Sequence, residues 1–259
     1  MPANRRVAIG NLKFIGGKVV GSPGGAIANA GFLTISDCSF ANNTATLALG
    51  APSGAAFGGA LWNAGSLTIL RCQFSNNSAS GGDYDSGAPE STQPGSRDGA
   101  IYSASGSLIV ESCEFSGNTA VGRTGYSSAI AGSGPGSPGS GGAIYRETGA
   151  ASVLRSSFST NDAAGGTGGS TMGSRGQPGG FGRGGAVYWN AGVALIEDCS
   201  FTTNRARGGQ GGQGTGAIFM VPNPGGPGGG AVGGAIASGG GSGLEMNRCT
   251  LSANIASGG

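Results

Sequence analysis

Short blocks of alternating apolar and polar residues recur along this chain and predict its secondary structure. In the first full block, Leu33 and Ile35 flank Thr34, and Phe40 follows Cys38 by two positions. A period of two places the apolar residues on one face of a strand, so the block predicts two short strands. The step from Ile35 to Cys38 is three residues, so the chain must turn between them to keep both inside. A helix is excluded because its apolar period would be about 3.6.

The block belongs to a repeat that occurs six times, with half a further copy at the start of the chain. The first two copies read GGAIANAGFLTISDCSFANNTA (24–45) and GGALWNAGSLTILRCQFSNNSA (58–79), and the others begin at positions 98, 141, 184 and 233. One aromatic position recurs, with Leu in the last copy: Phe14, Phe40, Phe74, Phe115, Phe158, Phe201 and Leu251. An Asn stands three residues later, with Gly in the first copy: Gly17, Asn43, Asn77, Asn118, Asn161, Asn204 and Asn254. A period of 26 to 50 residues is typical of solenoids. We predict an all-β parallel β-helix of about six to seven rungs, forming a single domain over residues 1–259.

The inward positions predict ladders of identical side chains. We expect the Phe rings to stack and each Asn amide to bond the Asn of the next rung, as in cross-β stacks. Asn43 follows a second turn, where an Asn tolerates a left-handed backbone. A third strand, Gly25 to Ile27, would complete a triangular coil.

Cysteine occupies one inward position in most copies. The five thiols are Cys38, Cys72, Cys113, Cys199 and Cys249, and Ser156 takes the place in the fourth copy. Their odd number and wide spacing do not fit a zinc site. Rungs lie about 4.8 Å apart, whereas a disulfide needs Cβ atoms about 3.8 Å apart. We interpret them as buried structural thiols; a redox or metal ladder is the alternative.

The residue before each cysteine position alternates in charge. These residues are Asp37, Arg71, Ser112, Arg155, Asp198 and Arg248. Neighbouring rungs would pair Asp37 with Arg71, and Asp198 with both Arg155 and Arg248. Exposed pairs contribute about 0.2–1 kcal/mol each, so we expect them to fix the register rather than to bind an anion.

Glycine-rich insertions separate the repeats and lengthen along the chain. They cover residues 20–23, 46–57, 80–97, 121–140, 164–183 and 207–232. All leave the same corner of the coil, so they must stack on one side. They are either flexible or packed as a second layer in which missing side chains permit close approach. Phe57, Phe181 and the run 217–221 favour packing.

An aromatic stripe follows the Gly-Gly-Ala-Ile segments. Its members are Trp62, Tyr102, Tyr145 and Tyr188. If the preceding Ile faces inward, these rings face outward, where they could stack on sugar rings or a partner surface. The alternative is that the insertions fold over the stripe and bury it.

Composition restricts the function classes. Gly (59 residues) and Pro (11) would indicate disorder without the period. A net charge of +2 gives no reason to expect nucleic-acid binding. No apolar run reaches the ~18 residues of a membrane span. The opening MPANRRVAIGNLKF lacks the apolar stretch of a secretory signal, so we expect any export information elsewhere.

Catalytic residues are sparse. The nearest acidic cluster is Asp83, Asp85 and Glu90, with Arg97 and Asp98 following, and there is no histidine. Nothing repeats this cluster on neighbouring rungs, and a solvated loop tip explains it. We therefore predict no enzyme activity, no catalytic residue, no cofactor and no metal.

Two motifs carry a resemblance to a known family. Gly-Gly-Ala followed by Ile, Leu or Val stands at Gly24 to Ile27, Gly58 to Leu61, Gly141 to Ile144, Gly184 to Val187 and Gly233 to Ile236. Phe-x-x-Asn stands at five places from Phe40/Asn43 to Phe201/Asn204. The chain thus resembles the polymorphic outer-membrane proteins of chlamydiae and related autotransporter passengers. The resemblance implies a right-handed parallel β-helix on the outer surface of a bacterial cell, commonly in adhesion.

The two end rungs suggest self-association. The chain starts half-way through a rung, at Val7 to Ile9, and stops at Asn254 to Ala256 followed by Ser-Gly-Gly. Uncapped rungs would offer open strand edges to a second copy, and a head-to-tail contact propagates into a filament. The alternative interpretation is that the chain is a segment of a longer surface protein. We expect a non-enzymatic extracellular structural or adhesive solenoid that contacts itself, a host protein or a cell-surface glycan. The alternative is a carbohydrate-binding module, with polysaccharide degradation less favoured.

Overall fold

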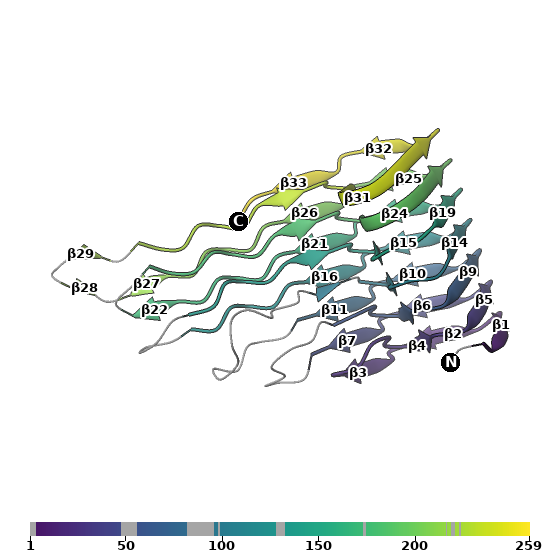
Figure 1. Cartoon of the computed structure of the whole chain (residues 1–259), viewed down its shortest axis with the longest axis horizontal. Coiled ribbons are helices and arrows are strands. Elements are labelled where there is room, and N and C mark those ends of the chain that lie inside the picture. Colours follow the sequence, from purple (N-terminus) through teal and green to yellow (C-terminus); the bar gives the residue numbers. More distant parts are fainter. Residues whose placement is uncertain are drawn as a thin grey trace.

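The computed structural model describes residues 4–47, 56–81, 96–97, 99–127, 133–172, 175–215, 217–218, 221–222 and 224–259. Within these residues the chain is all-β, without a helix, and coils into a parallel β-helix whose rungs stack one above another (Figure 1). The strands of successive rungs pair in parallel, as the repeat predicted.

Two of the sheets run the full length of the coil with seven strands each, which confirms the expected number of rungs. The first contains β2 (Lys13–Ile15), β6 (Ser39–Ala41), β10 (Gln73–Ser75), β15 (Glu114–Ser116), β20 (Ser157–Ser159), β25 (Ser200–Thr202) and β32 (Thr250–Ser252). The second contains β3 (Lys18–Val20), β7 (Thr44–Thr46), β11 (Ser78–Ser80), β16 (Thr119–Val121), β21 (Asp162–Ala164), β26 (Arg205–Arg207) and β33 (Ile255–Ser257).

The remaining side of the coil carries two rows of strands in one eleven-stranded sheet. One row is β1 (Arg6–Gly10), β5 (Phe32–Ser36), β9 (Ser66–Leu70), β14 (Leu108–Glu111) and β19 (Ala151–Leu154). The other is β4 (Ile27–Asn29), β8 (Leu61–Asn63), β13 (Ile101–Ser103) and β18 (Ile144–Arg146). In the last two rungs a single long strand spans both rows, β24 (Val187–Glu197) and β31 (Ile236–Asn247).

The predicted strand from Gly25 to Ile27 is wrong in its position, because β4 begins at Ile27. Gly24 has a φ of 77° and makes the turn into the strand. Gly25 lies so close to the next rung that a Cβ there would be 2.1 Å from the carbonyl oxygen of Gly59. The glycine pair is therefore required by a tight corner, a role for which other residues lack room.

The phenylalanine ladder forms the centre of the core. Strand register places each Phe directly over the next, from Phe14 to Phe201. Ring centroids are 4.7–4.8 Å apart with the planes within 6°. Phe40, Phe74, Phe115, Phe158 and Phe201 are all buried. Each ring is thus shared between two rungs, and the stack couples the rungs along the whole coil.

The asparagine ladder is confirmed, and its amides are fully bonded. The Nδ2 of Asn118 donates to Oδ1 of Asn161 and to the carbonyl oxygen of Phe74, both at 2.9 Å. Its Oδ1 accepts from the backbone and side-chain nitrogens of Asn77 at 3.0 and 2.9 Å. The same pattern continues to Asn254. Each amide therefore closes the turn of the rung before it, where the sheet bonds are interrupted.

The expected left-handed backbone at Asn43 is wrong by one residue. Positive φ values occur at the residue before each ladder Asn: Asn42, Asn76, Gly117, Thr160, Thr203 and Ala253. The left-handed residue points its side chain to solvent, whereas the ladder Asn must point inward. The earlier turn is as predicted, since Asp37 has a φ of 52°.

The insertions form a second layer beside the coil. Their return segments pair in a four-stranded sheet of β12 (Ser96–Arg97), β17 (Gly139–Ser140), β23 (Gly182–Arg183) and β30 (Ala231–Val232). Further out lie β22 (Thr171–Met172), β27 (Gly214–Thr215), β28 (Ala217–Ile218) and β29 (Val221–Pro222). Figure 1 shows these segments projecting together from one side of the coil. The described parts of the last three insertions are thus packed, in agreement with the second of the two alternatives.

Each packed insertion has an outgoing and a returning arm, and its hydrogen bonds recur every three residues. The backbone N–H groups of Gly165, Gly168 and Thr171 donate to the next insertion, at Arg207, Gln210 and Gln213. Those of Gly166 and Gly169 donate to a returning arm, at Ser137 and Gly134. Three residues per turn is the period of the polyproline II helix. We call this double sheet of extended arms the glycine layer.

Glycine is required where two arms approach most closely. A Cβ on Gly166 would be 1.9 Å from the carbonyl oxygen of Arg123, and one on Gly180 would be 2.0 Å from that of Ser137. In the Gly-Gly-x triplets the third residue faces outward and carries the side chain, whereas in the insertion at 121–140 the buried residues Arg123 and Ser137 take the equivalent inward positions. This explains the Gly-Gly-x text of the insertions.

Candidate functional site

The aromatic stripe exists as a column but is not an exposed surface. Register places Trp62, Tyr102, Tyr145 and Tyr188 on successive strands. The ring centroids of Tyr102 and Tyr145 are 5.5 Å apart, and those of Tyr145 and Tyr188 are 5.1 Å apart. The three tyrosines are only 4–7% exposed, and Trp62 is half-buried. The rings point out of the coil, and of the two alternatives for the stripe, burial is the one observed for the three tyrosines.

Other side chains complete this aromatic cluster. The ring of Phe57, from the second insertion, packs against Tyr102 with a centroid distance of 4.5 Å. The Tyr102 hydroxyl donates to Glu147 Oε2 at 3.1 Å, and Asn190 Nδ2 donates to the other oxygen at 3.0 Å. The hydroxyl of Tyr102 is thus engaged within the protein and all three rings are buried, so the tyrosines stabilise the insertion corner rather than form an exposed surface for sugar stacking.

A buried polar column, missed from the sequence, runs beside the stripe at the ends of the same short strands. It consists of Asn29, Asn63, Ser103, Arg146 and Trp189, all at most 1% exposed. Asn29 Nδ2 donates to Asn63 Oδ1 at 2.7 Å, and Asn63 Nδ2 donates to Ser103 Oγ at 3.1 Å. Only the paired Asn residues gave a signal in the sequence, because the later members share no chemistry.

Arg146 is the unusual member of this column. Its guanidinium donates to Ser103 Oγ and to the carbonyl oxygens of Ser105, Gly106 and Ala150. Burial lowers the pKa of Arg146 to about 10. Its Nε, like Nε1 of Trp189, has no hydrogen-bond partner among the described residues. Neutral oxygen atoms accept the hydrogen bonds of this cation, and these bonds fix the geometry of the corner.

Ion pairs on the outside of the coil follow the prediction in part. Arg71 bonds Asp37 through Nε and Nη2, both at 2.7 Å, and Arg248 Nε bonds Asp198 at 2.7 Å. The predicted pair of Arg155 with Asp198 is wrong, since Arg155 bonds Glu111 of the preceding rung. The Arg71 hydrogen bond lowers the pKa of Asp37 below its usual range.

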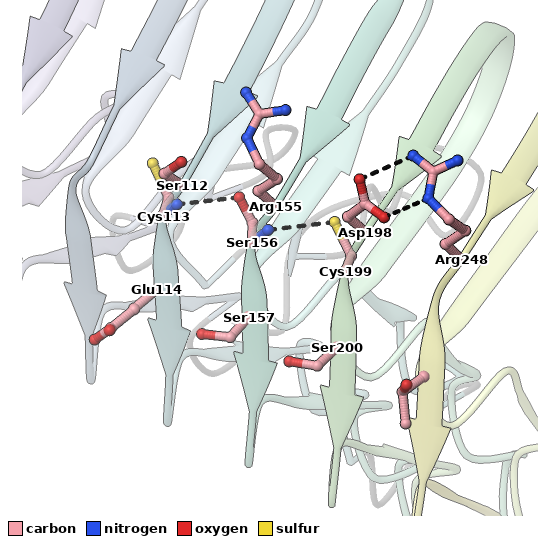
Figure 2. Close-up of a pocket in the computed structure, with 11 residues that line it drawn as sticks. Ser112, Cys113, Glu114, Arg155, Ser156, Ser157, Asp198, Cys199, Ser200 and Arg248 are labelled. Atoms are coloured by element: carbon pink, nitrogen blue, oxygen red, sulfur yellow. Dashed lines mark hydrogen bonds and ion pairs between the residues drawn. The ribbon is translucent and has the colours of Figure 1, made fainter.

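A polar groove lies at the corner between β14–β19–β24 and β15–β20–β25. Cys113, Ser156 and Cys199 form its floor, and Arg155 and Arg248 stand at its rim (Figure 2). The backbone N–H of Cys113 donates to Ser156 Oγ at 3.1 Å, and that of Ser156 donates to Cys199 Sγ at 3.4 Å. We call this series of inward side chains, from Cys38 to Cys249, the thiol column.

The thiol column takes the place of sheet hydrogen bonds at a turn. The N–H of Cys38 donates to Cys72 Sγ, and that of Cys72 to Cys113 Sγ, each at 3.4 Å. Each thiol in turn donates to the carbonyl oxygen two residues before it. Burial raises the pKa of Cys199 to about 11, so this thiol is protonated at neutral pH. The cysteines are thus free, as expected, and structural bonds account for their position.

The glycine layer presents two chemically different outer faces. On the outgoing arms the outward residues are polar, and Thr124, Thr167 and Gln210 form an exposed column in register. On the returning arms the matching column is Pro135, Pro178 and Pro227, also exposed. Proline is tolerated there because the outward N–H makes no bond within the layer.

Other predicted features fall partly outside the described residues. Asp83, Asp85, Glu90 and Asp98 are among those positions, and only the backbone of Arg97 is described. Within the described part of the chain, no group of three or more His, Cys, Asp or Glu side chains is arranged to hold a metal ion. The same residues include no helix long and apolar enough to cross a membrane.

Comparison of the chain with protein-family models, with curated proteins and with solved structures finds no match.

Proposed function

We propose that this protein is a non-enzymatic structural solenoid of the outer surface of a bacterium, with an adhesive role carried by its glycine layer. The observation that carries the proposal is that different positions of a triplet have different roles in that layer. In the Gly-Gly-x triplets two residues are fixed by close backbone contacts, while the third faces solvent. Such a surface can display many side-chain combinations on an unchanged scaffold, which suits recognition of variable targets.

Carbohydrate is the target class that the polar face fits best. Thr124, Thr167 and Gln210 offer hydroxyl and amide groups in one exposed column, without charge. Uncharged donors and acceptors at regular spacing match the hydroxyl groups of a glycan chain. Trp62, the accessible end of the aromatic stripe, provides an apolar surface on a different side of the same corner.

Glycan-array binding by the purified chain tests this proposal. A triple variant, Thr124→Ala, Thr167→Ala and Gln210→Ala, should lose at least tenfold in apparent affinity. The matched control changes two threonines and a glutamine that are exposed on another sheet: Thr202→Ala, Thr250→Ala and Gln73→Ala. Equal loss in both variants, or unchanged binding in the first, would contradict the assignment to the glycine layer.

End-to-end stacking of copies is a second candidate. The first rung exposes Leu12, Ile15 and Val20, each more than half exposed, and the last rung exposes Leu251 and Ile255 to 50%. If the register continues across the joint, Leu251 of one copy meets Phe14 of the next and Cys249 meets Leu12, with open strand edges beside them. The joint would lack three ladder bonds, since Leu12 has no acceptor for the N–H of Cys249, and Gly17 has none for the N–H and the amide of Asn254. Electron microscopy decides: fibres along the coil axis support stacking, and a concentration-independent monomer excludes it.

A further inference from the structure

The thiol column contains neighbouring cysteines that are not joined by disulfides. Its five free cysteines fall into two runs, Cys38–Cys72–Cys113 and Cys199–Cys249, which Ser156 separates. Adjacent positions in each run belong to successive rungs. The column therefore offers three neighbouring thiol pairs, two of which share Cys72.

The spacing of these sulfur atoms follows from their repeated surroundings. Cys38 and Cys72 each donate a backbone N–H to the sulfur of the next rung at the same 3.4 Å. Every sulfur also lies 3.2–3.3 Å from the carbonyl oxygen two residues before it. We therefore infer that neighbouring sulfurs are separated by the rung spacing. This spacing is 4.7–4.8 Å between the ring centroids of the Phe ladder.

This spacing is too long for a disulfide but suits one ion between two thiolates. The Zn–S bond of about 2.3 Å sets the scale for a d¹⁰ ion of the first transition row, so an ion midway between two sulfurs needs them at most about 4.6 Å apart. Linear coordination by two ligands is the preference of soft monovalent d¹⁰ ions, and thiolates select such ions. Zinc would need four ligands in a tetrahedron, and each interval of the column supplies two.

Access and charge also fit a cationic ligand. Cys113 and Cys199 lie on the floor of the groove in Figure 2, and Cys38 lies on the floor of a second groove beside Leu12 and Asp37. The sulfurs are nearly buried, so an ion held there is shielded from competing water ligands. The ion pairs of Arg71 with Asp37 and of Arg248 with Asp198 leave no net positive charge beside these thiols, which favours a cation over an anion.

We propose that the thiol column binds Cu(I) ions, one between each neighbouring pair of cysteines. Binding at Cys199 and Cys249 replaces two S–H protons by one ion and gives a complex of charge −1. In the longer run two ions replace three protons, with Cys72 bridging them, again giving charge −1. No electron is transferred, and the released protons pass to solvent.

Anaerobic titration of the full chain with Cu(I), against a chromophoric Cu(I) chelator, tests the proposal, with Ag(I) as a second probe. We expect three ions per folded chain, with near-ultraviolet thiolate absorption and proton release. Cys72→Ser removes two pairs and should leave one ion, whereas Cys38→Ser removes one pair and should leave two. The comparison is matched, because each variant loses a single thiol.

Serine at these positions is compatible with the fold, since Ser156 already accepts the same backbone bond in its rung. The converse variant, Ser156→Cys, joins the two runs and should raise the count from three to five. It keeps the test available if Cys72→Ser folds poorly by circular dichroism. Equal losses in Cys38→Ser and Cys72→Ser, no added ions in Ser156→Cys, or uptake only by the unfolded chain would each overturn the proposal.

Discussion

The asparagine ladder allows a stability effect to be worked out bond by bond. Replacing Asn118 by alanine leaves two buried groups without partners, the backbone N–H of Asn77 and one N–H of its amide, and the carbonyl oxygen of Phe74 loses one bond while its strand pairing remains. Each buried polar group left unsatisfied costs about 1–3 kcal/mol, so the sum is roughly 2–6 kcal/mol. We expect the lower end, about 2–3 kcal/mol, because a water molecule can enter the space and restore part of the bonding.

Urea unfolding followed by circular dichroism measures this loss, and hydrogen exchange locates it. The amide proton of Asn77 should exchange faster in Asn118→Ala, whereas that of Asn204, in a later rung, should not change. Asn76→Gly is the control, because glycine occupies the equivalent turn position at Gly117. It should shift the free energy of unfolding by less than about 0.5 kcal/mol. A loss below about 1 kcal/mol in Asn118→Ala would refute the view that these amides close the turns.

The other expectations concern the ring stack, the glycine layer, an ion pair and a thiol. Phe115→Ala should destabilise the coil by about 3–5 kcal/mol in urea unfolding, because it leaves a cavity in the middle of the stack. Gly166→Ala should cost about 1–3 kcal/mol and speed proteolysis of the insertions, because its Cβ meets a backbone oxygen. The pKa of Asp37 is lowered by Arg71, so the pair stabilises above the ordinary value of 3.8 and loses this effect as the pH falls through the lowered pKa. The urea midpoints of Arg71→Ala and the unmodified chain should therefore converge in acid. Cys199 should react slowly with a thiol reagent at pH 8 until the chain unfolds, since burial raises its pKa to about 11.

Matched variants separate these effects from general damage. Leu251→Ala removes an apolar side chain from the same ladder at a half-exposed position and should cost far less than the Phe115 change. Thr167→Ala lies next to Gly166 but faces solvent, so it should leave proteolysis unchanged. A mild Phe115→Ala phenotype, or equal sensitivity of Gly166→Ala and Thr167→Ala to protease, would contradict the packing described above.

Features that depend on the spacing of the repeat were predicted correctly. Features that depend on a choice between two equivalent neighbouring residues were not. The inward ladders followed from spacing, because a period of two leaves one choice of face for Phe115 or Asn118. The partner of Arg155 did not, since Glu111 and Asp198 are both within reach of a long side chain on neighbouring rungs. The turn after the Phe ladder was placed one residue late, as both Asn42 and Asn43 are compatible with a left-handed backbone.

Burial of the aromatic stripe and of the Arg146 cation depends on tertiary packing, which the sequence pattern does not give. Tyr102 and Tyr145 point away from the coil, but whether they meet solvent depends on packing at the insertion corner, where Phe57 lies. The column of Asn29, Ser103, Arg146 and Trp189 changes chemistry at every rung, so no repeated letter marks it. The Gly-Gly-x triplets of the insertions have the same period of three as their hydrogen bonds. The sequence alone nevertheless did not distinguish a packed layer from a flexible linker.

The triplet bonding of the glycine layer restricts how the gene can change in length. Insertion or loss of one Gly-Gly-x unit, nine nucleotides, keeps every later residue of an arm in phase with its neighbours. Insertion or loss of one or two residues would shift the phase, so that a side chain would point at the backbone of the next arm. The insertion at 207–232 exceeds that at 164–183 by six residues, and the added length lies between its two arms, where β28 and β29 pair antiparallel. Unequal exchange between such repeats would thus lengthen an arm by about 9 Å per step, given 3.1 Å per residue, while the coil stays intact.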